Sequence, residues 1–255
     1  MLTKSQRLLQ LVYPITMNKN LFSFAVVNAF KVALFVMVLG SCTSSTDSTQ
    51  SVSNPTESQS SVNESASVDA RKTILFFGDS ITAGYGIEEE DAFPALIQKK
   101  LDSLDLQWKS VNAGLSGETS AGGLRRIDWL LQQKIDILVL ELGGNDGLRG
   151  VSPEQTRQNL EGIIEKTRAT YPDCIIILAG MQIPPNLGQD YANSFADVFT
   201  DVAESHDPYL IPFILEGVGG DPRLNLPDGI HPTAQGHRIV AETVWEYLEP
   251  LVSEQ

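Results

Sequence analysis

The chain has few residues of the kinds that bind metals or form disulfides, because its 255 residues include only two cysteines and three histidines. No Cys, His or carboxylate residues cluster at the short spacings of a metal site, so we predict no metal. The Gly-rich turns also lack the Gly-x-Gly-x-x-Gly and P-loop patterns, so we predict no other cofactor. The two cysteines do not look like a disulfide pair. Cys174 opens the apolar run 174–179, which is the setting of a buried structural thiol.

Positive charge is also scarce. Lys and Arg total 18 against 32 Asp and Glu, and the formal net charge is −14. Residues 1–41 carry four of the basic residues and no acidic one, so their removal would bring the charge to −18. Phosphate recognition needs clustered Lys or Arg, and no such cluster occurs. We therefore predict no nucleic-acid partner.

The N-terminal apolar stretch, residues 32–39, is shorter than the roughly 20 residues that a membrane-spanning helix needs. It follows basic residues, as in a secretory signal peptide. Counting back across Lys31 to Leu21 lengthens the run, which leaves an uncleaved signal anchor as an alternative. Residues 39–42, Leu-Gly-Ser-Cys, resemble the lipobox of bacterial lipoproteins. This resemblance implies that Cys42 is lipidated and becomes the mature N-terminus.

Three segments follow from the change in composition along the chain. Residues 1–41 are predicted to be a lipoprotein signal peptide, and residues 42–70 a Ser/Thr-rich tether. The tether has too few large apolar side chains to offset its ordering entropy, so we expect it to be disordered. Residues 71–255 are predicted to form one globular domain, held outside the cytoplasm, in the periplasm or at the cell surface, by a lipid anchor.

From residue 72 onward, short apolar runs alternate with segments of helical periodicity. Asp91 is predicted to cap a helix over residues 93–104, and Ser152 to cap the next one before Pro153. A last helix is expected from about Thr233 to Leu251. This alternation predicts an α/β fold with a parallel sheet covered on both faces, whose sites lie at the carboxyl ends of the strands. The strands are expected at residues 73–77, 108–112, 137–142, 174–179 and 209–213.

Four motifs stand at or after these strand ends and together resemble the conserved blocks of the SGNH (GDSL-like) hydrolase family. They are Gly-Asp-Ser at 78–80, Ser-Gly-Glu-Thr at 116–119, Gly-Gly-Asn-Asp at 143–146 and Asp-Gly-Ile-His at 228–231. The strings around 143–150 and 228–232 look most like the bacterial thioesterase/lysophospholipase and arylesterase branch. The resemblance covers essentially residues 72–252 and implies a three-layer α/β/α, flavodoxin-like fold with a five-stranded parallel sheet.

The resemblance also implies the roles of particular residues. Ser80 would be the nucleophile, with His231 as its general base and Asp228 orienting the imidazole. The oxyanion would be bound by the backbone N–H groups of Ser80 and Gly117 and by the side-chain amide of Asn145. Taken alone, the Gly-Asp-Ser could be a tight strand–helix turn, and Asn145 could be a turn residue.

The remaining histidines and the substrate contacts are harder to assign from sequence. His237 is expected to face outward from the last helix, and His206 to lie near a helix end. Leu148, Ile183 and Leu187 are candidates for an acyl channel, although they could equally be packing residues. Arg149 is either a surface charge or a contact for a polar headgroup.

We therefore predict a serine esterase, a carboxylic ester hydrolase acting on acyl esters or thioesters. Arylesterase, acyl-CoA thioesterase and lysophospholipase activities are the types that the resemblance implies. The expected partners are a small acyl ester or lysolipid and, through Cys42, a membrane; we expect a monomer. Two alternatives remain: a carbohydrate O-deacetylase on the same fold, and a surface lipoprotein without catalytic activity.

Overall fold

The computed structural model describes residues 71–253. The predicted signal peptide, the tether and Cys42 lie outside the described residues, so the lipid anchor stays a prediction. Among residues 71–253, no helix is both long enough and apolar enough to cross a membrane.

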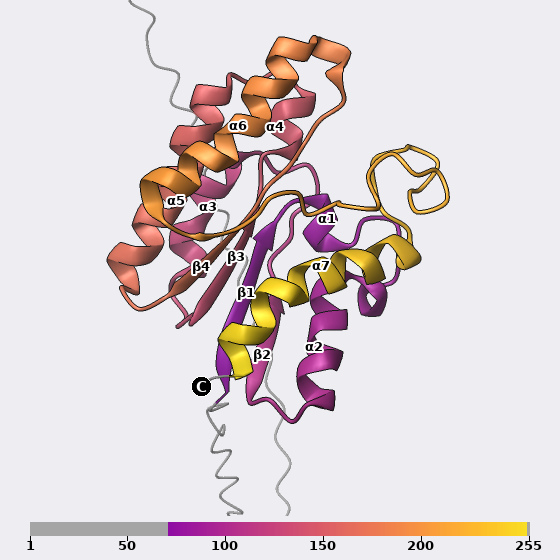
Figure 1. The fold of residues 1–255 in the computed structure, drawn as a ribbon. Coiled ribbons are helices and arrows are strands. Elements are labelled where there is room, and N and C mark those ends of the chain that lie inside the picture. Colours follow the sequence, from indigo (N-terminus) through magenta and orange to yellow (C-terminus); the bar gives the residue numbers. More distant parts are fainter. Residues whose placement is uncertain (1–70, 254–255) are drawn as a thin grey trace, which may run out of the picture. The chain divides into compact units, whose positions relative to one another are not determined.

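Five parallel strands form the sheet, in the order β2-β1-β3-β4-β5 (Figure 1). Phe76 of β1 is in register with Asn112 of β2 on one side and with Val139 of β3 on the other. The strand order reverses beside β1, which makes the crevice between β1 and β3 the expected place for a ligand. The bounds are Lys72–Gly78 for β1, Trp108–Asn112 for β2, Ile137–Glu141 for β3, Ile175–Ala179 for β4 and Tyr209–Ile211 for β5.

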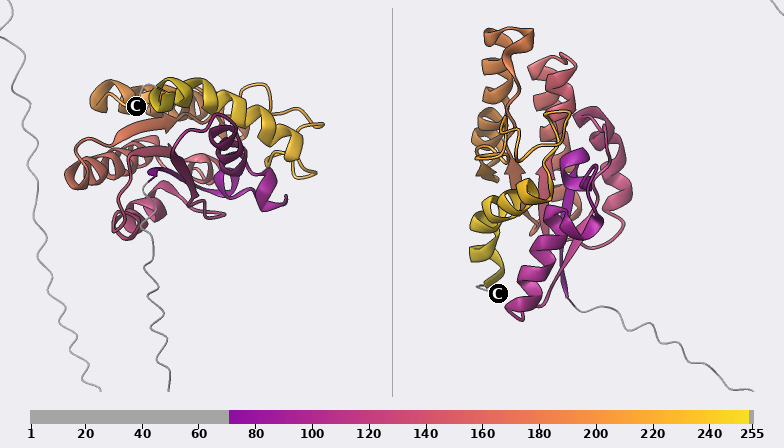
Figure 2. Two further views of the ribbon diagram at one scale, coloured as in Figure 1. Left: turned by 90° about the horizontal axis from the view of Figure 1, so that it is seen from below. Right: turned by 90° about the vertical axis from the view of Figure 1, so that its right-hand side faces the viewer.

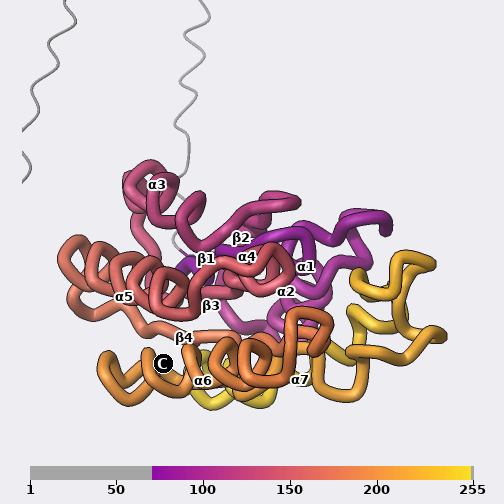
Figure 3. Tube along the Cα trace, turned by 90° about the horizontal axis from the view of Figure 1, so that it is seen from above, coloured from indigo at the N-terminus to yellow at the C-terminus, as the bar shows by residue number. Residues whose placement is uncertain are grey.

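Helices cover both faces of this sheet, which confirms the predicted three-layer α/β/α fold. Seen from above, α3 and α5 lie on one side of the strands and α2 lies on the other (Figure 3). On the first side α5 packs against both α3 and α6, and on the second α2 packs against α7 (Figure 2). The bounds are Ser80–Ala83 for α1, Phe93–Ser103 for α2, Ser120–Leu130 for α3, Gly144–Leu148 for α4, Pro153–Thr170 for α5, Gln189–His206 for α6 and Ala234–Ser253 for α7. Two short 3₁₀ turns, η1 at Glu89–Asp91 and η2 at Pro185–Leu187, complete the described elements.

The core consists of the apolar strands and the helix faces that pack on them. Ile74, Phe76 and Phe77 of β1 are fully buried, because a parallel strand covered on both faces needs apolar side chains on both. Cys174 is a buried free thiol, as predicted, and burial raises its pKa to about 12. A thiol in that state is unreactive near neutral pH.

The predicted helix caps are only partly right. Ser152 is the N-cap residue of α5, but its side chain makes no capping hydrogen bond. Asp91 does not cap α2: it ends η1, and Ala92 occupies the N-cap position. The carboxylate of Asp91 instead lies 3.6 Å from the guanidinium of Arg238 on α7. The extra 3₁₀ turn displaces Asp91 from the cap.

His237 is fully buried, so the expectation that it faces outward is wrong. Its Nδ1 accepts a hydrogen bond of 3.2 Å from the backbone N–H of Phe93 at the start of α2, and its ring stacks on the Phe93 ring. It therefore satisfies one of the orphan N–H groups of that helix end. Burial lowers the pKa of His237 to about 4, so the imidazole is neutral in the folded protein.

This neutral imidazole makes stability depend on pH. The ordinary pKa of 6.5 applies in the unfolded chain and about 4 in the fold, so the unfolded state binds the extra proton between these values. Stability is therefore lost as pH falls through that window, by up to about 3 kcal/mol. We predict that His237→Asn, whose Oδ1 can still accept from Phe93, unfolds in urea with a weaker pH dependence than wild type between about pH 7.5 and about pH 4.5. His206→Asn, at the end of α6, is the control. If the free energy of unfolding changed with pH equally in wild type and in His237→Asn, His237 would not be the source of this pH dependence.

Candidate active site

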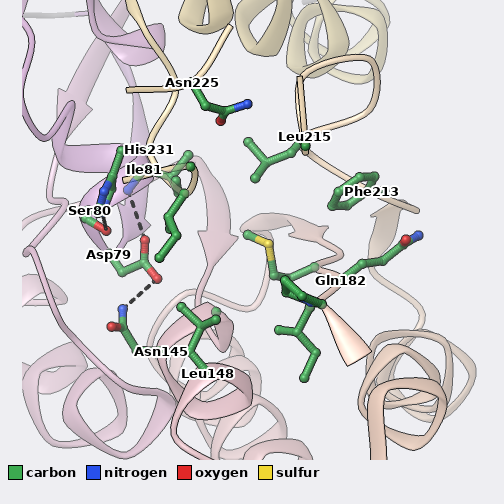
Figure 4. Close-up of a pocket in the computed structure, with 18 residues that line it drawn as sticks. Asp79, Ser80, Ile81, Asn145, Leu148, Gln182, Phe213, Leu215, Asn225 and His231 are labelled. Carbon is green, nitrogen blue, oxygen red and sulfur yellow. Dashed lines mark hydrogen bonds between the residues drawn. The ribbon is translucent and has the colours of Figure 1, made fainter. Parts of the chain in front are cut away.

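Ser80 stands at the turn from β1 to α1. Gly78 ends the strand, and a Cβ at that position would overlap the Thr82 hydroxyl and the Glu141 carboxylate, so only glycine fits there. Asp79 follows, and its Oδ1 caps the first turn by accepting from the N–H of Ile81 at 3.0 Å. The chain thus leaves the sheet sharply, and the Ser80 side chain faces a cavity at the carboxyl end of β1 (Figure 4).

The loop after β5 brings Asp228 and His231 to this serine. The Nε2 of His231 lies 2.9 Å from Ser80 Oγ, and its Nδ1 lies 2.7 Å from Asp228 Oδ2. The other carboxylate oxygen of Asp228 accepts from the N–H groups of Ile230 and His231, at 2.9 and 3.0 Å. The structure therefore joins Ser80, His231 and Asp228 in one chain of hydrogen bonds, although Ser80 and His231 are 151 positions apart in the sequence.

The electrostatics of Asp228 fix the direction of these hydrogen bonds. The backbone N–H groups of His231 and Ile230, together with the His231 side chain, lower the pKa of Asp228 to about 2. The carboxylate is consequently ionised at neutral pH and can only accept, so the proton of a neutral His231 ring belongs on Nδ1. Nε2 is then unprotonated and accepts from the Ser80 hydroxyl, which is the arrangement a general base requires.

Tyr85 covers one face of His231, and the sequence reasoning missed it. The two ring centroids are 4.5 Å apart with a 42° angle between the planes, and about half of the tyrosine is exposed. The backbone N–H of Tyr85 also bonds to the carbonyl of Ser80 at 3.0 Å. The only sequence signal was its position five residues after the serine.

The three predicted oxyanion donors lie beyond the ends of the first three strands. Asn145 is the second residue of α4, which follows β3, and its Nδ2 donates to Asp79 Oδ2 at 3.0 Å. Gly117, in the loop between β2 and α3, has φ +79°, a conformation that favours glycine. The guanidinium of Arg149 contacts both the Gly117 carbonyl and Asn145 Oδ1, so these two residues are neighbours in space. The N–H of Ser80 is at the first position of α1, where no intrahelical partner exists.

An ion pair holds the inner side of the Gly117 loop. Arg126 binds both carboxylate oxygens of Glu118 and donates to the Ala113 carbonyl at 2.8 Å. Its guanidinium lies 4.7 Å from the ring centroid of Phe77. Because Glu118 is buried, this charge pair is shielded from solvent and ties both ends of the loop to α3.

Two buried carboxyl groups lie behind the serine, which the sequence reasoning also missed. Glu141, the last residue of β3, is fully buried and accepts from the Thr82 hydroxyl at 2.8 Å and from the Asp79 N–H at 3.2 Å. Burial and the nearby Asp79 raise the pKa of Glu141 well above its ordinary value. Burial likewise raises the pKa of Asp79 to about 6, although hydrogen bonds from Ile81 and Asn145 oppose the shift. A glutamate ending an otherwise apolar strand was the available signal.

The cavity beside Ser80 has a volume of about 420 Å³. Ser80, Asp79 and His231 lie on one side of it, with Phe213 and Gln182 across from them (Figure 4). Leu148 and Ile183 line it as predicted, but Leu187 does not. Leu187 lies in η2, about half exposed, where it approaches Gly150 instead. The other apolar side chains of the lining are Ile81, Met181, Pro184, Phe213, Leu215 and Ile230.

Within residues 71–253, no group of three or more His, Cys, Asp and Glu residues is placed to hold a metal ion. The groups that surround Ser80 are the imidazole of His231, the carboxylates of Asp228 and Asp79 and the amide of Asn145. Their order matches the division of labour in Ser-His-Asp hydrolases, where a carboxylate orients the base and the base takes the proton of the nucleophile.

Comparison with known proteins places this arrangement in a family. Residues 76–239 match the GDSL-like Lipase/Acylhydrolase family. The chain is 44% identical over 184 residues to Esterase TesA of Pseudomonas aeruginosa, covering 72% of this chain and 90% of that protein. It is 38% identical over 185 residues to Thioesterase 1/protease 1/lysophospholipase L1 of Escherichia coli K12, covering 72% and 86%. A solved structure, "Crystal Structure of TesA", superposes with a TM-score of 0.68 at 44% identity, covering 71% of this chain and 99% of that one. The chain therefore belongs to the GDSL-like lipase/acylhydrolase family.

Proposed function

We propose that the protein is a serine esterase that hydrolyses acyl esters or thioesters, with Ser80, His231 and Asp228 as its catalytic triad. The observation that carries this proposal is the hydrogen-bonded chain from Asp228 through His231 to Ser80, which borders an apolar cavity. Family membership and the names of the two relatives, an esterase and a thioesterase/lysophospholipase, support the same reaction class.

In the first half of the reaction, Ser80 Oγ attacks the carbonyl carbon of the ester while His231 Nε2 accepts the hydroxyl proton. The ionised Asp228 stabilises the imidazolium that forms. The negative charge on the carbonyl oxygen is bound by the N–H groups of Ser80 and Gly117 and by Asn145. The Asn145 amide has two hydrogens, and its bond to Asp79 uses one of them, so the other remains for the oxyanion.

The tetrahedral intermediate then collapses. The bond to the leaving oxygen or sulfur breaks, and His231 returns its proton to that atom, which leaves the acyl group on Ser80. A water molecule next gives its proton to His231 and attacks the acyl carbon, and the second collapse releases the carboxylic acid and restores the Ser80 hydroxyl. These steps use side chains and backbone N–H groups of the protein together with one water molecule.

The cavity favours an acyl chain over an acetyl group. An acetyl group would leave most of an apolar volume of about 420 Å³ unfilled. Each additional CH₂ group buried there contributes about 0.8 kcal/mol to binding. The lining thus supports a substrate with an extended acyl chain, such as a lysolipid, rather than an acetylated carbohydrate.

We also propose that the protein is an exported lipoprotein, anchored through Cys42 in the periplasm or at the cell surface. The sequence Leu-Gly-Ser-Cys at 39–42, after an apolar stretch, supports this location. The predicted consequence is that the full chain expressed in a bacterium partitions into the detergent phase, whereas Cys42→Ala does not. Cys174→Ala is the matched control, because that thiol is buried in the domain. If the Cys42→Ala protein still partitioned into the detergent phase, the result would favour an uncleaved signal anchor instead.

The esterase proposal predicts serine-dependent hydrolysis of p-nitrophenyl esters. Wild type should turn over esters of medium or long acyl chains faster than the acetyl ester, because the longer chains fill the apolar cavity. Ser80→Ala should lose turnover entirely while keeping the melting temperature of wild type within a few degrees, since one small oxygen atom is removed. Turnover that persists in Ser80→Ala would exclude Ser80 as the nucleophile, and an acetyl-only preference would favour the carbohydrate deacetylase.

A further inference from the structure

We propose that Arg149 is a positioning residue that fixes the orientation of the Asn145 amide and holds the Gly117 loop beside it. This inference rests on the proposed function, in which Asn145 and Gly117 bind the oxyanion. It gives a role to a side chain that could otherwise be read as a surface charge.

The contacts of Arg149 are those of a bridge between two oxyanion donors. One nitrogen of its guanidinium donates to the Gly117 carbonyl at 3.1 Å and to Asn145 Oδ1 at 3.3 Å. Arg149, the C-cap residue of α4, follows Asn145 by four positions, about one helical turn, which brings the two side chains to the same side of the helix end. The side chain therefore links the loop after β2 to the helix after β3.

Asp79 holds the other end of the same amide. Its Oδ2 accepts from Asn145 Nδ2 at 3.0 Å (Figure 4). A guanidinium can only donate hydrogen bonds, and an ionised carboxylate can only accept them. The two neighbours therefore require the same orientation, with the amide oxygen toward Arg149 and the nitrogen toward Asp79. A flipped amide would present its oxygen to the oxyanion and repel it.

The guanidinium also strengthens the amide as a donor. A hydrogen bond from a cation to the amide oxygen polarises the group, which makes its N–H a better hydrogen-bond donor. On the Gly117 side, Arg149 complements Arg126, which holds the inner face of that loop through Ala113 and Glu118. Because Gly117 has a left-handed backbone and lies in a loop, a fixed carbonyl restricts the direction of its peptide.

These contacts predict an effect on kcat that depends on Asn145. Arg149→Met should lower kcat about 10-fold, a part of the 10²–10³-fold loss expected for Asn145→Ala, which removes a donor completely. KM should change by less than about 2-fold, since the ground-state ester does not carry the oxyanion charge. Arg149→Lys should recover most of the loss, because both contacts are made by one nitrogen of the guanidinium and an ammonium can also donate to both oxygens.

The experiment measures kcat and KM for p-nitrophenyl esters with the full chain and these variants. Arg125→Met, an exposed arginine of α3, is the control for removal of one surface charge. Arg149→Met is also made in the Asn145→Ala background, where its effect on kcat should shrink to less than about 3-fold. Melting temperatures, with Arg149→Gln as a second neutral variant, show that any loss of kcat occurs in folded protein.

Two results would overturn the inference while leaving the proposed function intact. The first is Ser80-dependent turnover in Arg149→Met at the level of Arg125→Met. The second is a loss that appears only in KM and is equal in both backgrounds, because that would make Arg149 a contact for the substrate headgroup. Absence of Ser80-dependent turnover in wild type would instead overturn the proposed function and, with it, this inference.

Discussion

The site depends on the parallel pairing of all five strands, which places every strand's carboxyl end at the same edge of the sheet. Ser80 follows β1, Gly117 follows β2 and Asn145 follows β3, so three residues far apart in sequence lie around one crevice. The loop after β5 then closes the group by bringing His231 to within 2.9 Å of Ser80. A register shift in any of these strands would move its terminal residue away from the others, which is why the apolar core and the site are specified together.

The buried carboxyl groups behind Ser80, those of Asp79 and Glu141, lower the stability of the folded protein near neutral pH. Burial raises the pKa of Asp79 to about 6 from its ordinary 3.8, so the folded state binds more protons than the unfolded state between these values. Stability therefore falls as pH rises through that window, and the fully buried Glu141 adds a cost of the same sign. The buried His237 has the opposite dependence, because its pKa is lowered. The Asp79 carboxylate nonetheless accepts from Asn145 and Ile81, which orders the turn that carries the serine.

The sequence was informative where a residue's environment is set by local pattern. The apolar runs predicted all five strands within two residues of their observed bounds, and the strand-end motifs predicted the residues that now meet around Ser80. Predictions from the sequence were wrong or missing where a residue's environment is set by packing between distant elements. His237 is buried only because α7 lies against the start of α2, and the 3₁₀ turn η2 keeps Leu187 out of the cavity. Tyr85 and Glu141 were missed because their partners are chosen by tertiary contacts, not by neighbours in sequence.

Activation of the Ser80 hydroxyl by His231 can be tested by covalent capture of the serine. An alkyl fluorophosphonate reacts with an activated serine when the hydroxyl oxygen bonds to phosphorus, fluoride leaves and the base accepts the proton. Mass spectrometry of the intact protein and of its peptides would count and locate the adducts. We expect one phosphonyl group per chain, on Ser80. A folded protein with no adduct, or with the adduct on another residue, would contradict it.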